Sequence, residues 1–367
     1  MAIYIDSLDI LEFRGIKKLN LKSLNHINII AGDNNSGKTS ILEAISLLKN
    51  PKEIYNVIKT SRIREEGNRL FSPTLFESFI NMLPQDTMHI GISTKGVIGE
   101  IDLELSGEIK NILVDSTTMG FSKTNRNSNY ASNEIETPCF YGEYKFVINS
   151  NYDSIPFEFT QFTKFNDLPR YRLNYINVSY LSPARHLSSG NISNIVRSGS
   201  YKELCVYLLK LFDEEIEDIL YLKNDLTQRP IECLRHKTLG TMPLSTYGDG
   251  IKKVISLANG IASAKDGILL IDEIETSIHS KYYQDIFAFV LKACMQFNVQ
   301  IFITTHNKEA IDAILSIQDY NNKIVEHDPV NVITFRVDRE TRQTFSRTLS
   351  GSEVLQNRDK YDFEVRL

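Results

Sequence analysis

Residues 32–40 read Gly-Asp-Asn-Asn-Ser-Gly-Lys-Thr-Ser, and this stretch decides the fold of the chain. It fits the pattern G-x-x-x-x-G-K-[ST] without a mismatch. The apolar run Ile27–Ala31 before it is predicted to be a strand, and the spacing of apolar residues in 40–48 predicts a helix after it. The stretch is therefore predicted to be a phosphate-binding loop between a strand and a helix.

The residue types of this loop suit a polyphosphate. Glycines allow backbone N–H groups to wrap the phosphates, and the helix N-terminus adds partial positive charge. Lys38 is expected to reach the β- and γ-phosphates, and the hydroxyl of Thr39 is expected to hold Mg²⁺. The nucleotide-binding candidates of this stretch are Gly32, Asn34, Asn35, Ser36, Gly37, Lys38, Thr39 and Ser40.

Two adjacent acids follow a second apolar run. Residues 267–271 are predicted to form a buried strand that delivers Asp272 and Glu273 at its carboxyl end. Asp272 is expected to hold Mg²⁺ through water, and Glu273 is expected to orient and polarise the attacking water. The alternative for this pair is a strand that ends in a solvated acidic turn.

A third buried strand is predicted at residues 300–304, and His306 follows it. A histidine beside the γ-phosphate could report its presence and help to fix the water. A single histidine is more often structural. Because this strand is the next predicted core strand after the one that ends at Asp272, we count His306 with Glu273 as a catalytic candidate.

A polar, glycine-containing turn at residues 244–250 leads into the predicted helix 251–262. A helix N-terminus with a nearby hydroxyl is a second place where an anion could bind. An ordinary helix cap explains the same residues.

The composition excludes some classes of protein. A net charge of -5 over 367 residues gives no general basic field, so nucleic-acid binding would need a local patch or a partner. The four cysteines have no C-x-x-C spacing, which indicates free thiols in a reducing compartment. No apolar run approaches the length of a membrane span, and Asp6, Asp9 and Glu12 rule out a signal peptide in residues 1–13. We expect a cytoplasmic protein without a membrane partner.

The pattern of predicted elements divides the chain. Beyond residue 245 helices alternate with strands, which is typical of a mainly parallel α/β sheet. Before it, residues 200–223 are predicted to be helical, and so are residues 53–83, with a break around Gly67 and residues 72–73. Residues 88–180 are predicted to form short β-type runs. No heptads persist, so no long coiled coil is expected. The predicted units are an ATPase-like core in two lobes, an insertion, and a tail that packs on the head; their ranges are 1–50 with 240–340, 51–239, and 341–367.

The order of these motifs resembles the ABC-type ATPases of the RecF/SMC/OLD branch. The order runs from Arg14-Gly15 through the phosphate loop and the Ser-x-x-Gly turn to Asp272-Glu273, residues 275–280 and Thr304–Asn307. The chain is most similar to the small, stand-alone OLD-like AAA family ATPases of prokaryotic anti-phage and toxin systems. The resemblance implies an α/β P-loop NTPase head of the ABC type, with a mixed sheet and a β-rich and helical insertion.

In that family two heads sandwich two ATP molecules, and the turn before the signature helix contacts the nucleotide of the partner head. Carried over here, the γ-phosphate contact comes from the hydroxyl of Ser245 or Thr246, with Gly248 and Gly250 as backbone donors. Because the turn departs from L-S-G-G-Q, both hydroxyls stay candidates.

Three further residues have family counterparts. Arg14 resembles the arginine that reaches the nucleotide phosphates in related heads, and a solvated surface arginine is the competing interpretation. Arg185 is expected to face either the nucleotide or the partner head. Gln85 is a candidate for the glutamine of the Mg²⁺ and water loop, with an ordinary polar loop residue as the alternative.

The resemblance implies an ATPase that uses ATP and Mg²⁺ and forms a dimer or higher homo-oligomer through ATP. About sixty residues follow His306, too few for the Toprim nuclease of the OLD enzymes. We therefore expect a regulatory subunit of an anti-phage system like PARIS, Septu or a retron-associated version, which controls a separately encoded effector such as a nuclease. The alternative is a RecF/SMC-like DNA-binding ATPase in DNA repair or chromosome maintenance.

Overall fold

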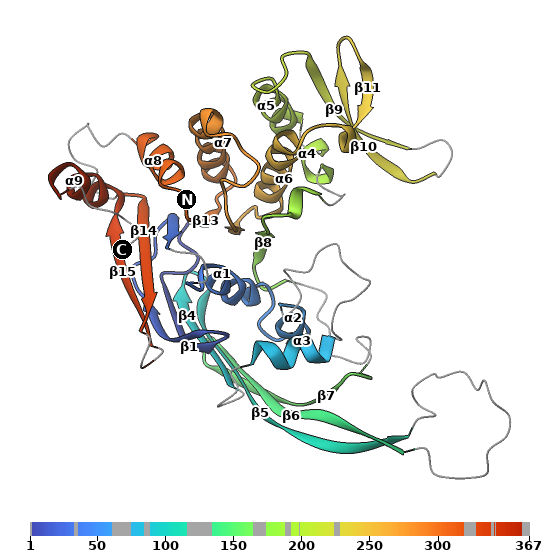
Figure 1. Cartoon of the computed structure of the whole chain (residues 1–367), viewed down its shortest axis with the longest axis vertical. Helices are drawn as coiled ribbons and strands as arrows, with labels where there is room; N and C mark the ends of the chain where they lie inside the picture. The colour runs from blue at the N-terminus through green and yellow to red at the C-terminus, as the bar shows by residue number, and fades with distance from the viewer. Residues whose placement is uncertain are drawn as a thin grey trace.

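The computed structural model describes residues 2–32, 36–60, 75–83, 89–115, 134–163, 174–187, 192–197, 199–223, 228–318, 328–338, 341 and 343–361. The candidates Asn34, Asn35 and Gln85 lie outside the described residues. The described chain contains two six-stranded sheets and one three-stranded sheet (Figure 1).

One six-stranded sheet is parallel except at one edge, where β14 and β15 form an antiparallel hairpin. Its spatial order is β15-β14-β3-β13-β12-β8. Three of its inner strands, β3, β12 and β13, are buried at every residue, as expected of strands covered on both faces. The strands are β3 Ile27–Ala31, β8 Asn177–Leu181, β12 Gly267–Ile271, β13 Gln300–Thr305, β14 Val330–Val337 and β15 Thr344–Ser350.

Helices cover both faces of this sheet. Successive residues of a strand point to opposite faces, so each inner strand contributes to the core on either side. Ile29 packs into a core made with α4–α8, and its neighbour Ile30 packs into a core made with α1–α3 (Figure 1). The first group is α4 Ser193–Val196, α5 Gly199–Leu209, α6 Asp249–Ser263, α7 Tyr283–Gln296 and α8 Lys308–Ser316. The second is α1 Lys38–Ser46, α2 Ile54–Thr60 and α3 Leu75–Met82. Short 3₁₀ turns are η1 Leu47–Lys49, η5 Arg185–Leu187, η6 Leu244–Thr246 and η7 Ser280–Tyr282; α9 Gly351–Tyr361 follows β15.

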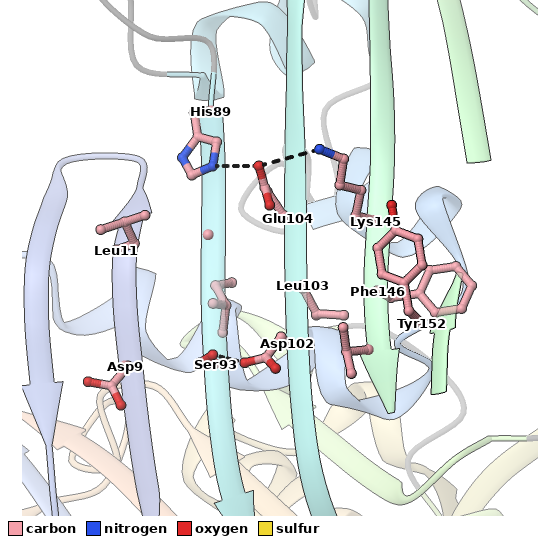
Figure 2. A pocket seen from close by; sticks show the side chains of 13 residues that line it. Asp9, Leu11, His89, Ser93, Asp102, Leu103, Glu104, Lys145, Phe146 and Tyr152 are labelled. Carbon is pink, nitrogen blue, oxygen red and sulfur yellow. Dashed lines mark hydrogen bonds and ion pairs between the residues drawn. The ribbon is translucent and has the colours of Figure 1, made fainter. Parts of the chain in front are cut away.

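The other six-stranded sheet is antiparallel and lies on the far side of α1–α3 (Figure 1). Its order is β2-β1-β4-β5-β6-β7, with β1 Ser7–Phe13, β2 Ile16–Leu21, β4 His89–Gly96, β5 Gly99–Asp115, β6 Glu134–Ile148 and β7 Asn151–Thr160. Its inner face is rich in aromatic rings: Phe79 of α3 meets Phe140 and Phe159 edge to face, at centroid distances of 5.3 and 5.4 Å. Its outer face holds a hollow of about 360 Å³ (Figure 2).

The three-stranded sheet corrects one prediction. Residues 200–223 are not one helix: α5 ends at Leu209, and β9 Ile216–Lys223 pairs with β10 Pro230–His236, which pairs with β11 Gly240–Pro243. A register shift between Arg235 and His236 lets Ile216 and Ile219, three residues apart, both reach the core. That spacing of apolar residues imitates a helix.

The predicted α/β class with a mixed sheet is confirmed. β8 lies within the range predicted as an insertion, 51–239, yet it pairs with β12 in the parallel sheet. The same range supplies β4–β7, which share a sheet with β1 and β2, and also β9 and β10 of the three-stranded sheet. In the described part of the chain the longest helix is α6, with 15 residues, so these residues contain no long coiled coil. None of the described helices has the length and apolar character needed to cross a membrane.

Candidate nucleotide site

The phosphate loop joins β3 to α1. Gly37 precedes the helix with φ 97°, a left-handed conformation that favours glycine, and a Cβ there would lie 3.3 Å from Cγ1 of Ile16. Nζ of Lys38 donates to the carbonyl of Gly32 at 2.8 Å, so the lysine folds back along the loop. Oγ of Ser36 is buried and has no hydrogen-bond partner among the described residues. An unsatisfied buried hydroxyl beside a lysine fits a loop that binds phosphate.

Asp272 is the centre of a hydrogen-bonded group at the carboxyl ends of the parallel strands. The hydroxyl of Thr39 lies 3.0 and 3.1 Å from its two carboxylate oxygens, and the hydroxyl of Thr304 donates to it at 2.6 Å. The phenol of Tyr180, at the end of β8, donates to it at 3.2 Å. Four elements therefore position one carboxylate next to the loop.

Glu273 begins the turn after β12. Its φ of 49° is unusual for a residue with a side chain, and such conformations concentrate at functional sites. Its N–H donates to Oγ1 of Thr304 at 2.8 Å, while the hydroxyl of Thr276 lies 3.4 Å from Oε2 of its carboxylate. Thr304 thus contacts the carboxylate of Asp272 and the backbone of Glu273, and holds the start of this turn in place.

Lys253 of α6 is a residue that the sequence analysis did not select. It is 2% exposed, and its Nζ lies 3.5 Å from the carbonyl of Glu273. Burial lowers the pKa of this lysine to about 8, although Glu275, Asp272 and Glu273 act in the opposite direction. No sequence signal distinguishes it from its neighbour Lys252, because only the fold brings this helix position against the turn after β12.

His306 follows β13 and is half exposed. Its Nδ1 and its backbone N–H both lie 3.1 Å from Oε1 of Glu275, a buried carboxylate of the same turn as Glu273. The three strand ends predicted to carry chemistry therefore meet at one edge of the sheet. The catalytic roles of His306 and Glu273 stay predictions.

The turn at residues 244–250 lies at the start of α6. Ser245 and Thr246 are exposed, and the hydroxyl of Thr246 donates to the carbonyl of Pro243 at 2.7 Å. Gly248 is the cap residue of α6 and offers no side chain to its free N–H groups, while Gly250 lies in the first turn. Among the described residues no hydrogen bond or ion pair joins this turn to residues 32–40 of the same chain. The turn therefore exposes two hydroxyls and a glycine cap at the start of α6.

Arg14 and Arg185 occupy different places. Nε of Arg14 lies 2.8 Å from the fully buried carboxylate of Glu43 in α1, and its Nη2 donates to the carbonyl of Thr60 at 2.8 Å. This arrangement ties β1 to α1 and α2; a contact of Arg14 with nucleotide stays a prediction. Arg185 lies in η5, on the wall of a cavity beside β8.

The residues present fit Mg²⁺ with a nucleotide. Mg²⁺ is commonly held by one or two protein oxygens together with phosphate oxygens and water, and Thr39 and Asp272 supply such a pair. Among the described residues no cluster of three or more His, Cys, Asp or Glu could hold a metal ion without other ligands. The geometry therefore defines a P-loop nucleotide site rather than a dedicated metal centre.

Comparisons with known proteins agree with this class. Residues 3–168 match a family described as "AAA ATPase domain", and residues 183–312 match one described as "AAA domain, putative AbiEii toxin, Type IV TA system". An "ATP/GTP phosphatase" of Helicobacter pylori (strain ATCC 700392 / 26695) is 22% identical over 339 residues, which cover 84% of this chain and 87% of the relative. RecF of Shewanella sp. (strain MR-4) is 24% identical over 371 residues, which cover 89% of this chain and 98% of the relative.

Among solved structures, an SMC head bound to the C-terminal winged-helix domain of ScpA aligns with 96% of this chain and 100% of that chain, at 11% identity and a TM-score of 0.49. That level of likeness carries no inference about function. The family matches, the two relatives and the geometry of the site support an ABC-type, RecF/SMC-like AAA ATPase, in agreement with the resemblance seen in the motifs.

Proposed function

We propose that the chain is a cytoplasmic regulatory ATPase that hydrolyses ATP between two heads and thereby controls a separately encoded effector of an anti-phage defence system. The observation that carries the ATPase part is the group formed by Thr39, Asp272 and Thr304 at adjacent strand ends. It supplies a hydroxyl and a carboxylate for Mg²⁺ and fixes the backbone of Glu273.

Each group has one task in this proposal. Lys38 and the backbone of the loop hold the β- and γ-phosphates, and Mg²⁺ bound through Thr39 and Asp272 would neutralise charge on the phosphate oxygens. The carboxylate of Glu273 accepts the proton of the attacking water, and the His306 imidazole, oriented by Glu275, lies beside the same edge of the sheet.

A nucleotide shared by two heads explains the separation of the turn at 244–250 from the loop of its own chain. The exposed hydroxyls of Ser245 and Thr246 and the uncapped N-terminus of α6 can then bind the γ-phosphate held by a partner copy. The defence role is supported by the AbiEii and type IV toxin–antitoxin description of the family that matches residues 183–312. An effector such as a nuclease completes this proposal.

Light scattering of the wild type and the Glu273→Gln variant, each with and without ATP and Mg²⁺, tests the shared nucleotide. Glu273→Gln keeps the shape of the side chain but cannot accept a proton, so we expect it to retain ATP and to double in mass only when ATP is present. Lys38→Ala is the matched control and should stay at the smaller mass. A Glu273→Gln protein that neither retains ATP nor changes size with it would exclude the sandwich.

A second candidate function is a RecF-like ATPase that binds duplex DNA, and the alignment over 98% of a RecF protein favours it. Against it, the hollow on the open face of the antiparallel sheet carries the carboxylates of Asp9, Asp102 and Glu104 against the ammonium of Lys145 and the ring of His89, and this excess of negative charge repels a polyanion. Binding of short duplex DNA with a non-hydrolysable ATP analogue, across a salt series, separates the two functions. DNA binding that weakens steeply with salt would favour the RecF-like function.

A further inference from the structure

A second cavity, of about 550 Å³, lies outside the nucleotide site described above. It lies where the edge strand β8 descends from α6 towards α1 and α2 (Figure 1), with η1 and α2 on one side and β8 and α6 on the other. None of its described lining residues belongs to the phosphate loop or to the acidic turn after β12. Its volume is in the range of pockets that hold small ligands and cofactors.

The walls of this cavity are polar and positively charged. Among its described lining residues, Lys49, Lys59 and Arg185 are cationic and Glu53 is the one carboxylate; Arg185 and Glu53 also have other partners. Inside a concave surface such an excess of cations raises the local concentration of anions. The cavity therefore favours a ligand with negative charge.

Other side chains suit the uncharged part of such a ligand. On opposite walls, Asn259 of α6 offers its Nδ2 donor and Asn56 of α2 its Oδ1 acceptor. The other half of each amide is engaged, because Oδ1 of Asn259 accepts from the N–H of Asn194 at 3.0 Å and Nδ2 of Asn56 donates to the carbonyl of Asn50 at 3.5 Å. The rings of Tyr55 and Tyr180 also line the cavity, and aromatic rings are the usual partners of a nucleobase. Ribose hydroxyls and ring nitrogens match the amides, and a base matches the rings.

We infer that this cavity binds a nucleoside phosphate, at a site separate from the ATP of the phosphate loop. The cations of η1, α2 and η5 take the phosphate, and the amides and tyrosines take the nucleoside. The α6–β8 wall is closely packed, since a Cβ on Gly260 would lie 2.7 Å from Cδ1 of Leu181. This wall is therefore formed before the ligand arrives.

Two contacts link the cavity to the ATP site. Tyr180 lines the cavity and donates to Asp272, and Thr60 lines it and accepts from Arg14. A ligand that moves either residue changes the position of the carboxylate proposed to hold Mg²⁺ or of the arginine paired with Glu43. This regulatory part rests on the proposed ATPase function, whereas binding in the cavity does not.

The binding test is calorimetric titration of AMP into the full chain carrying Lys38→Ala. AMP lacks the β- and γ-phosphates that the loop is built for, and the substitution removes the loop lysine as well. We expect one AMP per chain, with adenosine and inorganic phosphate each at least tenfold weaker. No binding of AMP, or binding of phosphate as tight as that of AMP, would overturn the inference.

Variants in which the charge of a lining lysine is reversed test whether AMP binds in the cavity. Lys49→Glu combined with Lys59→Glu should weaken AMP binding at least tenfold. Lys52→Glu, an exposed lysine of the same segment outside the cavity, is the matched control and should change it less than twofold. Circular dichroism checks that both variants are folded. Equal AMP affinity in the two variants would contradict the assignment.

The regulatory part is tested with Lys38 intact. We expect AMP to change the rate of ATP hydrolysis at saturating ATP at least threefold in the wild type and in Lys52→Glu, but not in the double variant. A chain that binds AMP without hydrolysing ATP would refute the proposed ATPase and leave the cavity assignment standing. Hydrolysis that is normal and indifferent to AMP would refute the link through Tyr180 and Thr60 alone.

Discussion

The two six-stranded sheets of this chain differ in where their polar side chains lie. In the parallel sheet the inner strands are apolar and buried, and the polar groups gather where the strands end, at Asp272, Thr304 and His306. In the antiparallel sheet polar residues alternate along the strands, so that one face packs on aromatic rings and the other is covered with charges.

Figure 2 shows the result on the outer face of the antiparallel sheet. His89 and Lys145 lie on either side of Glu104, with Nε2–Oε1 and Nζ–Oε1 distances of 3.5 and 4.0 Å, and Asp102 lies further along the same strand as Glu104. Burial, followed by the charge of Glu100, raises the pKa of Asp102. In the parallel sheet the candidate catalytic side chains lie at the ends of the strands, whereas the antiparallel sheet contributes its apolar face to the core.

The largest expected effect concerns stability in the antiparallel sheet. Phe140 is fully buried and contacts Phe79 and Phe157, so Phe140→Ala should lower the free energy of unfolding by about 3–5 kcal/mol. Urea unfolding measures this change. If the sheet serves only the core, the ATP affinity of the folded variant stays that of the wild type. A loss of ATP affinity in the folded variant would show that the antiparallel sheet also contributes to nucleotide binding.

The next effect concerns nucleotide binding in the parallel sheet. Lys38→Ala should weaken ATP binding about 100-fold or more, because a lysine–phosphate contact is worth about 3 kcal/mol. Glu104→Gln, on the outer face of the antiparallel sheet, is the control and should change the affinity less than twofold. Fluorescence titration with a labelled ATP analogue measures both. Equal losses of ATP affinity in the two variants would show that nucleotide binding is not confined to the parallel sheet.

The third effect concerns Lys253, an amine buried against the turn that carries Glu273. Its pKa lies near 8 in the folded chain and near 10.5 in a free lysine. Between these values the unfolded chain binds a proton that the folded chain has released, so stability due to this group rises with pH. Relative to Lys253→Met, the wild type should gain about 2–3 kcal/mol between pH 8 and 10.5.

Urea unfolding of both proteins at pH 7.5, 9 and 10.5 measures this difference. Lys252→Met, at the partly buried neighbour that pairs with the exposed Asp249, is the matched control and should follow the wild type. If the free energies of unfolding of the wild type and of Lys253→Met change with pH in the same way, the lowered pKa of Lys253 is contradicted.

The smallest expected effect comes from one hydroxyl. Thr304→Val keeps the shape of the side chain but removes the donor to Asp272 and the acceptor of the Glu273 N–H. The free energy of unfolding should fall by about 1–2 kcal/mol, because buried polar groups lose their partner. ATP hydrolysis should fall more than ATP affinity. A variant with unchanged hydrolysis would show that the relative position of the two acids does not matter.

The sequence alone predicts which residues lie at the carboxyl ends of the parallel strands. The motifs at residues 32–40, 272–273 and 304–307 each follow an apolar run, and parallel strands bring such ends together whatever the rest of the chain does. The contacts of Tyr180, Lys253 and Thr304 could not be predicted, because they join elements far apart in the chain and have no spacing of their own.

The predicted and the observed fold differ at two strands, and both differences have local causes. The spacing of Leu204, Leu208, Leu211 and Ile219 predicts one helix, but α5 ends at Leu209 and Ile219 belongs to the strand β9. The register shift in β9 lets Ile216 and Ile219, three residues apart, both reach the core, as in a helix. The strand β8 reads as one more β-type run after β4–β7, and nothing in its residues says that it joins the parallel sheet instead. In both cases the partner strand decides the structure, and the segment alone does not specify it.

The position of β3 has a consequence for how the chain is made. Both of its neighbours in the sheet, β13 and β14, come from residues 300–337, although β3 itself is residues 27–31. During synthesis the strand that carries the phosphate loop leaves the ribosome long before either partner exists. An apolar strand with two unpaired edges is prone to aggregate. We therefore expect the nascent chain to depend on a chaperone until about residue 337 has emerged, and chaperone crosslinking to stalled chains of increasing length can detect this dependence.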